Sequence, residues 1–225
     1  MRRQADAHGL QSSLKLDRAL VQTNTDGQTP PIAPGQSPAM LSQNNFINFC
    51  ALGLPQRPIT NGLQNTAGSC NPIVAGEIPA VTKMPSTKFQ SPTNGATITA
   101  STSFTVSVGA KNMQLGIFTN AASTYYANPQ VLNAAGLIQG HMHLVIEAIP
   151  SEDSTAVPDP QQFVFFQSVA TPADDNGVVH VNVTGGVPAG SYRMSTVLTA
   201  ATHQPVLVPV GMHGSLDDMI YFTAA

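Results

Sequence analysis

Alternating apolar and polar residues dominate the chain from about residue 86 onward. The clearest example is 139–149, where Met142, Leu144 and Ile146 fall on one side of an extended chain. Similar segments, separated by turn residues, occupy 97–109, 113–119, 162–170, 178–184, 190–199, 206–210 and 219–223. This period indicates β-strands, and no amphipathic helical pattern of about 12 residues interrupts the series.

About eight such strands predict an all-β protein, specifically an antiparallel β-sandwich with an immunoglobulin-like arrangement. The pairs Asn94-Gly95 and Asn176-Gly177 suit tight hairpin turns between antiparallel strands. A cupin-like barrel is the alternative architecture.

Two segments have a more specific predicted place in the sandwich. Pro205 and Pro209 flank or interrupt 206–210, so this strand is expected at an edge or at a bulge. Phe163, Phe165 and Phe166 are expected to be part of the core.

Composition divides the chain into three parts. Residues 1–45 are rich in Gln, Thr, Ser, Asn and Pro, which is typical of a polar N-terminal arm that is disordered or wraps a neighbouring surface. Residues 46–85 form a loop-rich segment that is expected to be closed by a disulfide, and residues 86–225 form the sandwich domain.

The two cysteines, Cys50 and Cys70, enclose a loop rich in Gly, Pro and Asn with little core of its own. A disulfide closing a loop of about 20 residues would add roughly 3 kcal/mol of stability. We therefore expect a disulfide between Cys50 and Cys70. The alternative is two separate buried thiols.

Charge is scarce along the chain. Of 225 residues, 9% are charged, only nine are Lys or Arg, and the net charge is −3. These values exclude nucleic-acid binding that depends on phosphate contacts, and the lack of a long apolar run argues against a membrane span.

Several features of the sequence favour an extracellular location. Gly and Pro number 18 each, a composition common among extracellular β proteins when charge is low. The sequon Asn182-Val183-Thr184 offers a glycosylation site at Asn182. The start of the chain shows no signal peptide, and Arg2-Arg3 fits the remnant of a processing site.

His141 and His143 are the sharpest chemical signal. Two residues apart on a strand, their side chains project from the same face with Cα atoms roughly 6.6 Å apart, which allows them to share one metal ion. His203 and His213 flank the predicted strand 206–210, and one of them is expected to complete a copper or zinc site. The alternative is a polar sheet face on which the histidines bond only to their neighbours.

The same stretch underlies the cupin alternative. Glu147 follows the His-x-His pair, as in the first cupin motif, but a straight strand places it about 13 Å from His143. In the second cupin motif, the histidine position is occupied by Arg193. The sandwich is therefore favoured.

Other catalytic arrangements are poorly supported, and no catalytic residue is assigned. Ser215 lies near His213 but in no Gly-x-Ser-x-Gly elbow. Asp217-Asp218 is interpreted as a solvated turn. The loop 120–139 carries Tyr125 and Tyr126, which either form a binding loop or pack on the sheet edge.

The chain resembles a family of secreted proteins from filamentous fungi, mainly wood- and litter-dwelling mushrooms. The resemblance covers about 44–225 and rests on NNFINFC (44–50), GSCNP (68–72), QGHMH (139–143), HQPVLVP (203–209) and HGSLDD (213–218). It implies secretion, and that the cysteine pair and the histidine segments occur together. The Gly-His-x-His strand is also similar to bacterial immunoglobulin-like domains.

Two functions remain open. The first is a secreted, cell-wall-associated protein with a binding or structural role, which binds wall polysaccharide or forms homo-oligomers through its arm. The second is a copper- or zinc-binding protein, either a metal carrier or a metal-dependent oxidoreductase, with His141, His143 and either His203 or His213 as ligands.

Overall fold

The computed structural model describes residues 13–51, 57–60, 65–72 and 75–225. Its strands are β1 (Ser69–Asn71), β2 (Gly76–Ile78), β3 (Ser86–Ser91), β4 (Ala96–Ile98), β5 (Phe104–Lys111), β6 (Met113–Gln114), β7 (Ile138–Ile149), β8 (Phe165–Val169), β9 (Val178–Val183), β10 (Gly190–Ala200) and β11 (Met219–Ala224). The helical elements are short: η1 (Arg18–Leu20), η2 (Phe49–Ala51), η3 (Val81–Lys83) and α2 (Ala121–Thr124). The all-β prediction is therefore confirmed.

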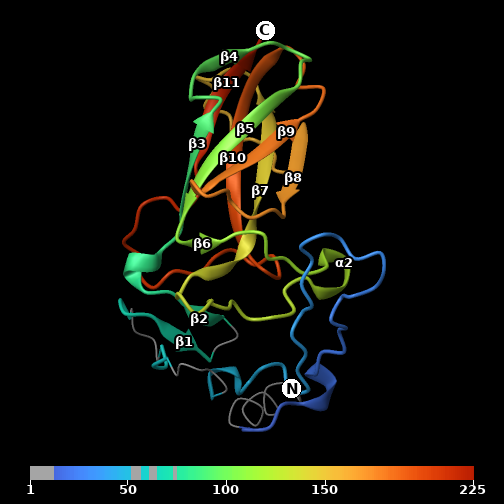
Figure 1. Ribbon diagram of the computed structural model, residues 1–225, viewed down its shortest axis with the longest axis vertical. Coiled ribbons are helices and arrows are strands. Elements are labelled where there is room, and N and C mark those ends of the chain that lie inside the picture. Colours follow the sequence, from blue (N-terminus) through green and yellow to red (C-terminus); the bar gives the residue numbers. More distant parts are fainter. Residues whose placement is uncertain (1–12, 52–56, 61–64, 73–74) are drawn as a thin grey trace, which may run out of the picture.

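Two sheets form the sandwich in the upper half of Figure 1. The larger has the order β4-β11-β10-β7-β6, with β8 also paired to β7, and the smaller has the order β3-β5-β9. Most pairs are antiparallel, but β4 with β11 and β6 with β7 are parallel. The sheets of the described residues do not close on themselves, so the cupin-like barrel is wrong.

The core lies between the two sheets and follows from the alternation of the sequence. Met142, Leu144 and Ile146 of β7 are fully buried and belong to one cluster with Val106 and Val108 of β5. Every second residue of these strands faces the opposite sheet, so burial drives the two layers together.

The pair β7 and β10 is the longest ladder and sets the position of the histidines. It runs from Ser191 opposite Ile149 to Ala200 opposite Gly140. At Gly140 a Cβ atom would lie 2.0 Å from the Thr199 carbonyl oxygen, so the close approach of the two backbones requires glycine there.

Three sequence predictions about the sandwich are wrong. Asn94-Gly95 and Asn176-Gly177 do not close hairpins, because β3 is not paired with β4, nor β8 with β9. The segment 206–210 is not a strand, and only an isolated bridge joins Thr199 to Pro205, because proline has no N–H to continue a ladder. Phe163 and Phe166 are not in the core. Their exposed fractions are 52% and 48%, whereas Phe165 is partly buried against the core cluster.

Below the sandwich, loops and the N-terminal segment form a base. The segment joins this base through Gln36, which forms a bridge with Phe118, and through Met40, whose backbone exchanges two hydrogen bonds with the Asn128 side chain. In Figure 1 this blue segment runs beside α2. The described part of the arm therefore lies on its own chain.

The base also contains the disulfide that the sequence predicted. Cys50 and Cys70 are bonded, and Cys70 lies in the small sheet formed by β1 and β2. Glu77 of β2 binds Arg57 at 2.8 Å and accepts a hydrogen bond from the backbone N–H of Leu132.

Residues 1–12, including Arg2-Arg3, lie outside the described residues. Among the described helices, none is both long and apolar enough to cross a membrane.

Candidate metal centre

His141 and His143 lie on the face of β7 that points away from the sandwich core. Their Nε2 atoms are 3.1 Å apart. Two nitrogens bound to one tetrahedral ion, at metal–nitrogen distances of about 2.0–2.1 Å, would lie about 3.3 Å apart. The strand alone therefore brings two imidazoles to the spacing of ligands that share an ion.

His203 is the third member of the cluster, and it comes from the turn after β10. Its backbone N–H donates to the Ala200 carbonyl, and its φ of 75° lies in the left-handed region, which is rare outside glycine. Its ring centre lies 4.6 Å from that of His141 and 5.8 Å from that of His143. The ligand atoms of the three residues all lie within 4.8 Å of one another.

All three imidazoles are held in the neutral form that binds metal. Burial, with the neighbouring His143 and His203, lowers the pKa of His141 to about 3. Burial and His203 lower the pKa of His143 to about 4, and burial also lowers the pKa of His203. Near neutral pH the nitrogens therefore keep the lone pairs that a cation needs.

Surrounding groups orient the ring of His141. It donates a hydrogen bond to the Ile117 backbone carbonyl, and the Thr199 hydroxyl lies 3.2 Å from its Nε2 atom. Phe118 packs edge-on at a ring distance of 6.1 Å. A backbone carbonyl that fixes the ring is the usual second partner of a metal-ligating histidine.

His203 carries an unsatisfied atom. Its Nδ1 is buried and has no hydrogen-bond partner among the described residues. A buried polar atom without a partner costs free energy, and it marks a place where an ion or a ligand is expected. The donor set is three imidazoles, which suits copper or zinc better than calcium or magnesium, which prefer oxygen ligands.

His213, the other candidate third ligand, is not part of the cluster. It is exposed, and its Nδ1 lies 2.6 Å from the Gly214 carbonyl oxygen. The choice between His203 and His213 is decided by the turn 200–204. This turn reverses the chain directly after β10 and brings His203 back to His141.

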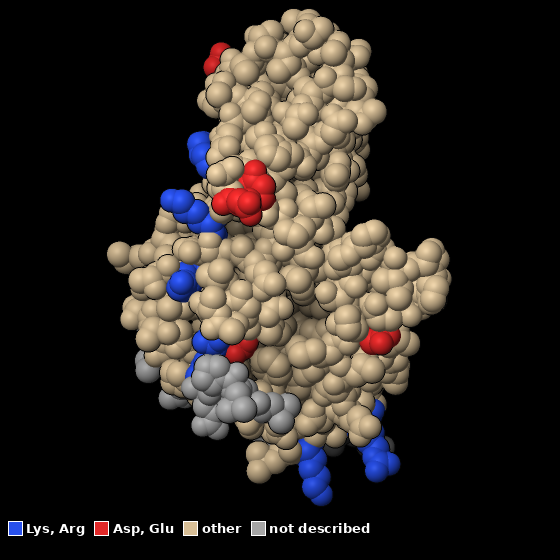
Figure 2. Space-filling model, viewed as in Figure 1, with Lys and Arg blue, Asp and Glu red and all other residues tan. Residues whose placement is uncertain are grey.

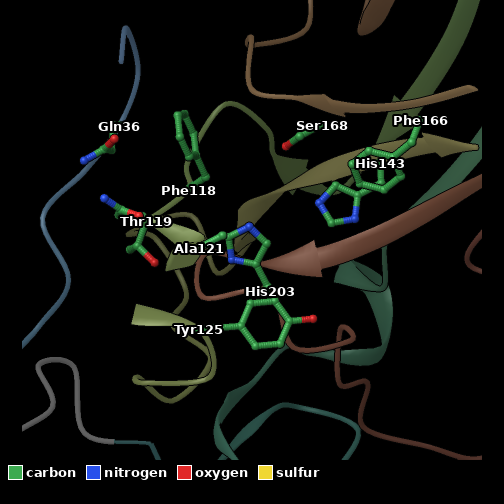
Figure 3. A pocket seen from close by; sticks show the side chains of 10 residues that line it. Gln36, Phe118, Thr119, Ala121, Tyr125, His143, Phe166, Ser168 and His203 are labelled. Atoms are coloured by element: carbon green, nitrogen blue, oxygen red, sulfur yellow. The ribbon is translucent and has the colours of Figure 1, made fainter. Parts of the chain in front are cut away.

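The cluster opens into a pocket of about 530 Å³. Figure 3 shows His143 and His203 on one side of this space, with Phe118, Gln36 and Ser168 around the remainder. The sequence does not reveal Phe118 and Phe166 as site residues, because their place at the pocket depends on where β6 ends and where β8 begins. Tyr125, in the predicted binding loop, is stacked on His203 at 5.2 Å.

The carboxylates near the histidines have structural partners. Glu147 lies opposite Arg193 on β10, and the two form a bidentate pair with an Nη2–Oε2 distance of 2.7 Å. Asp217 accepts from the backbone N–H of Leu198, and Asp218 binds Lys88 and the N–H of Phe89. The prediction of a solvated turn at Asp217-Asp218 is therefore wrong.

The relatives of the chain agree with the fungal resemblance noted in the sequence. A model of the CLU5d N-terminal domain matches residues 87–225, which is more than half of the chain. This chain belongs to the CLU5d N-terminal domain family. A relative of this CLU5d-family chain is "Pathogenicity cluster 5 protein d" of Colletotrichum graminicola, with 44% identity over 191 residues.

The CLU5d-family chain matches only part of that relative. The alignment covers 84% of this chain and 39% of the Colletotrichum protein. Among solved structures, the PmoD soluble domain from Methylocystis aligns with 63% of this chain and 89% of its own, at 11% identity and a TM-score of 0.31. That score is too low to indicate a shared fold.

Proposed function

We propose that this CLU5d-family chain is a secreted metal-binding protein that holds one copper or zinc ion on His141, His143 and His203. The observation that supports it most strongly is the convergence of three neutral imidazoles within 4.8 Å, from β7 and the turn after β10. Such a cluster costs free energy without an ion, because the buried Nδ1 atom of His203 has no hydrogen-bond partner among the described residues.

The pocket favours a role beyond structural ion binding. Three protein ligands leave a further coordination position, and the space beside His143 and His203 would allow a small molecule to reach it. Binding a ligand at the ion is therefore the main proposed role, and a metal-dependent oxidation is the second candidate, for which copper would be the ion.

Secretion is part of the same proposal. A disulfide joins Cys50 to Cys70, and disulfides persist mainly in oxidising compartments. Asn182 is exposed on β9 and belongs to a glycosylation sequon. Low charge and a fungal relative are in keeping with an extracellular fungal protein.

Metal content of the untagged protein, secreted from a fungal host, tests the proposal. We expect about one copper or zinc per chain by elemental analysis in the wild type and in His213→Ala, whose exposed imidazole lies outside the cluster. His203→Ala and the double variant His141→Ala/His143→Ala should lose the ion. A wild type that takes up neither metal when offered, or unchanged metal content in the double variant, would refute the site.

A further inference from the structure

A continuous row of aromatic rings crosses the candidate metal centre. The successive ring-centre distances are 4.3, 5.2, 5.8, 5.1 and 6.1 Å. We call this the aromatic row, and its members in order are Tyr126, Tyr125, His203, His143, Phe166 and Phe163. The tyrosines follow α2, Phe166 lies in β8 and Phe163 just precedes it, so two segments distant in sequence converge on the histidines.

The ends of the row are exposed to solvent. About half of the surface of Tyr125, Tyr126, Phe163 and Phe166 is accessible. Metal binding does not account for these rings, because the imidazoles alone supply the ligands. Neighbouring exposed apolar side chains on a soluble protein commonly mark a surface that binds a partner.

The polar groups of the pocket are uncharged. Its lining consists of the aromatic and imidazole rings and of hydroxyl, amide and methyl groups, and among these described residues none is Asp, Glu, Lys or Arg. Ser168 is exposed and offers its hydroxyl beside the pocket. Figure 2 shows that the face between β8 and α2 also lacks charged side chains.

Exposed aromatic rings beside uncharged polar groups favour one chemical class of ligand. Away from the proposed ion, a charged polymer would lose its hydration in the pocket without gaining contact with an oppositely charged side chain. A sugar ring offers apolar C–H faces that stack on aromatic rings, and hydroxyl edges that bond to amides and hydroxyls. An elongated row of rings with a polar pocket at its middle suits a chain of such units.

We propose that the aromatic row binds an uncharged polysaccharide chain, which lies across the metal centre with Tyr126 and Phe163 as its outer contacts. Only the middle of the row rests on the proposed metal site, because Tyr126 and Phe163 do not depend on the ion. The ion would then lie directly against the bound polysaccharide. The ligand that approaches the open coordination position of the ion would therefore be a neutral sugar.

Co-sedimentation of the full chain with insoluble polysaccharides tests this inference. Cellulose, chitin and an insoluble β-glucan are the neutral probes, and calcium pectate is the anionic comparison. We expect the wild type to bind at least one neutral polymer and not pectate. Tyr126→Ala/Phe163→Ala should weaken that binding about tenfold, the loss of two ring contacts. Met212→Ala, at an exposed apolar residue outside the row, should leave it unchanged.

Metal content is measured on the same samples, so that failure of the two proposals can be distinguished. A double variant that keeps its metal but loses the polymer supports the row. A metal-loaded wild type that binds no neutral polymer, or that prefers pectate, a phenolic polymer or a protein, overturns the polysaccharide and leaves the metal site standing. A metal-free wild type that still binds through Tyr126 and Phe163 supports the row and refutes the metal site.

Discussion

At the scale of single residues, the three histidines differ in how well the sequence predicts them. His141 and His143 are predictable, because their separation on a strand alone places both rings on one face. His203 is not distinguishable from His213 in the sequence, since the choice depends on a turn whose left-handed residue is a histidine instead of a glycine. Phe163 and Phe166 look like core residues, but Phe166 lies opposite Val145 on the outer face of the larger sheet, and Phe163 precedes β8.

The lowered histidine pKa values predict how stability depends on pH when no metal is bound. The unfolded chain takes up protons near pH 6.5, whereas folded His141 and His143 do so only near 3 and 4. Stability from these groups is therefore complete above about pH 6.5 and is lost as the pH falls toward 4. Thermal unfolding followed by circular dichroism, which suits a chain without tryptophan, should show a falling melting temperature across this range.

The control for this prediction is His141→Asn/His143→Asn, in which the two shifted groups are absent. Its melting temperature should depend less on pH between 6.5 and 5. Asp217 acts in the opposite sense, because burial raises the pKa of its carboxyl, and it is present in both the wild type and this control. A wild-type melting temperature that stays constant or rises from pH 6.5 to 5 would contradict the prediction.

At the scale of elements, the ladder between β7 and β10 supports both ends of the larger sheet. On its outer face, His141 lies opposite Thr199 near the pocket, and Glu147 lies opposite Arg193 near the other end. Regular alternation made these strands predictable. The predicted strand 162–170 is longer than β8. The segment 206–210 has the hydrophobic pattern of a strand, but its prolines prevent pairing.

Removing the arginine of this ladder should destabilise the protein measurably. Arg193→Ala would leave the buried Glu147 carboxylate without its partner, at a cost of about 2–3 kcal/mol, since the arginine itself is partly exposed. Urea unfolding of the variant would measure this loss. Lys88→Ala is the matched control: Lys88 pairs with Asp218 but is 71% exposed, so its removal should cost less than about 1 kcal/mol. Equal costs for both variants would argue against the pair as a stabilising contact.

At the scale of the whole molecule, the series of alternating segments predicted the all-β fold class, and the two cysteines are bonded as expected. The base was not predictable, because its order comes from many single contacts, such as Gln36 with Phe118 and Met40 with Asn128, that leave no periodic pattern.

Passage through the secretory pathway should modify Asn182. This side chain is exposed on β9, at an edge of the smaller sheet, with its Nδ2 atom 3.4 Å from the Thr184 hydroxyl. The protein secreted by a fungal host should carry an N-linked glycan that an endoglycosidase removes, as intact mass shows. Asn182→Gln should remove the mass added by the glycan. Asn176→Gln, which affects no sequon, should retain that added mass. Secreted protein with an unmodified mass would contradict the prediction.

The parallel pairing of β11 with β4 fixes the C-terminal end of the chain, and this has a consequence for attaching the protein to a support. Ala224 lies opposite Gly190 of β10, at the far end of the sandwich from Gly140 and the pocket (Figure 1). A tether joined after residue 225 would therefore present the aromatic row outward, about one full strand length from the support. Immobilisation through the C-terminus thus leaves the binding face open to particles as large as a wall fragment, whereas coupling near Gln36 would obstruct it.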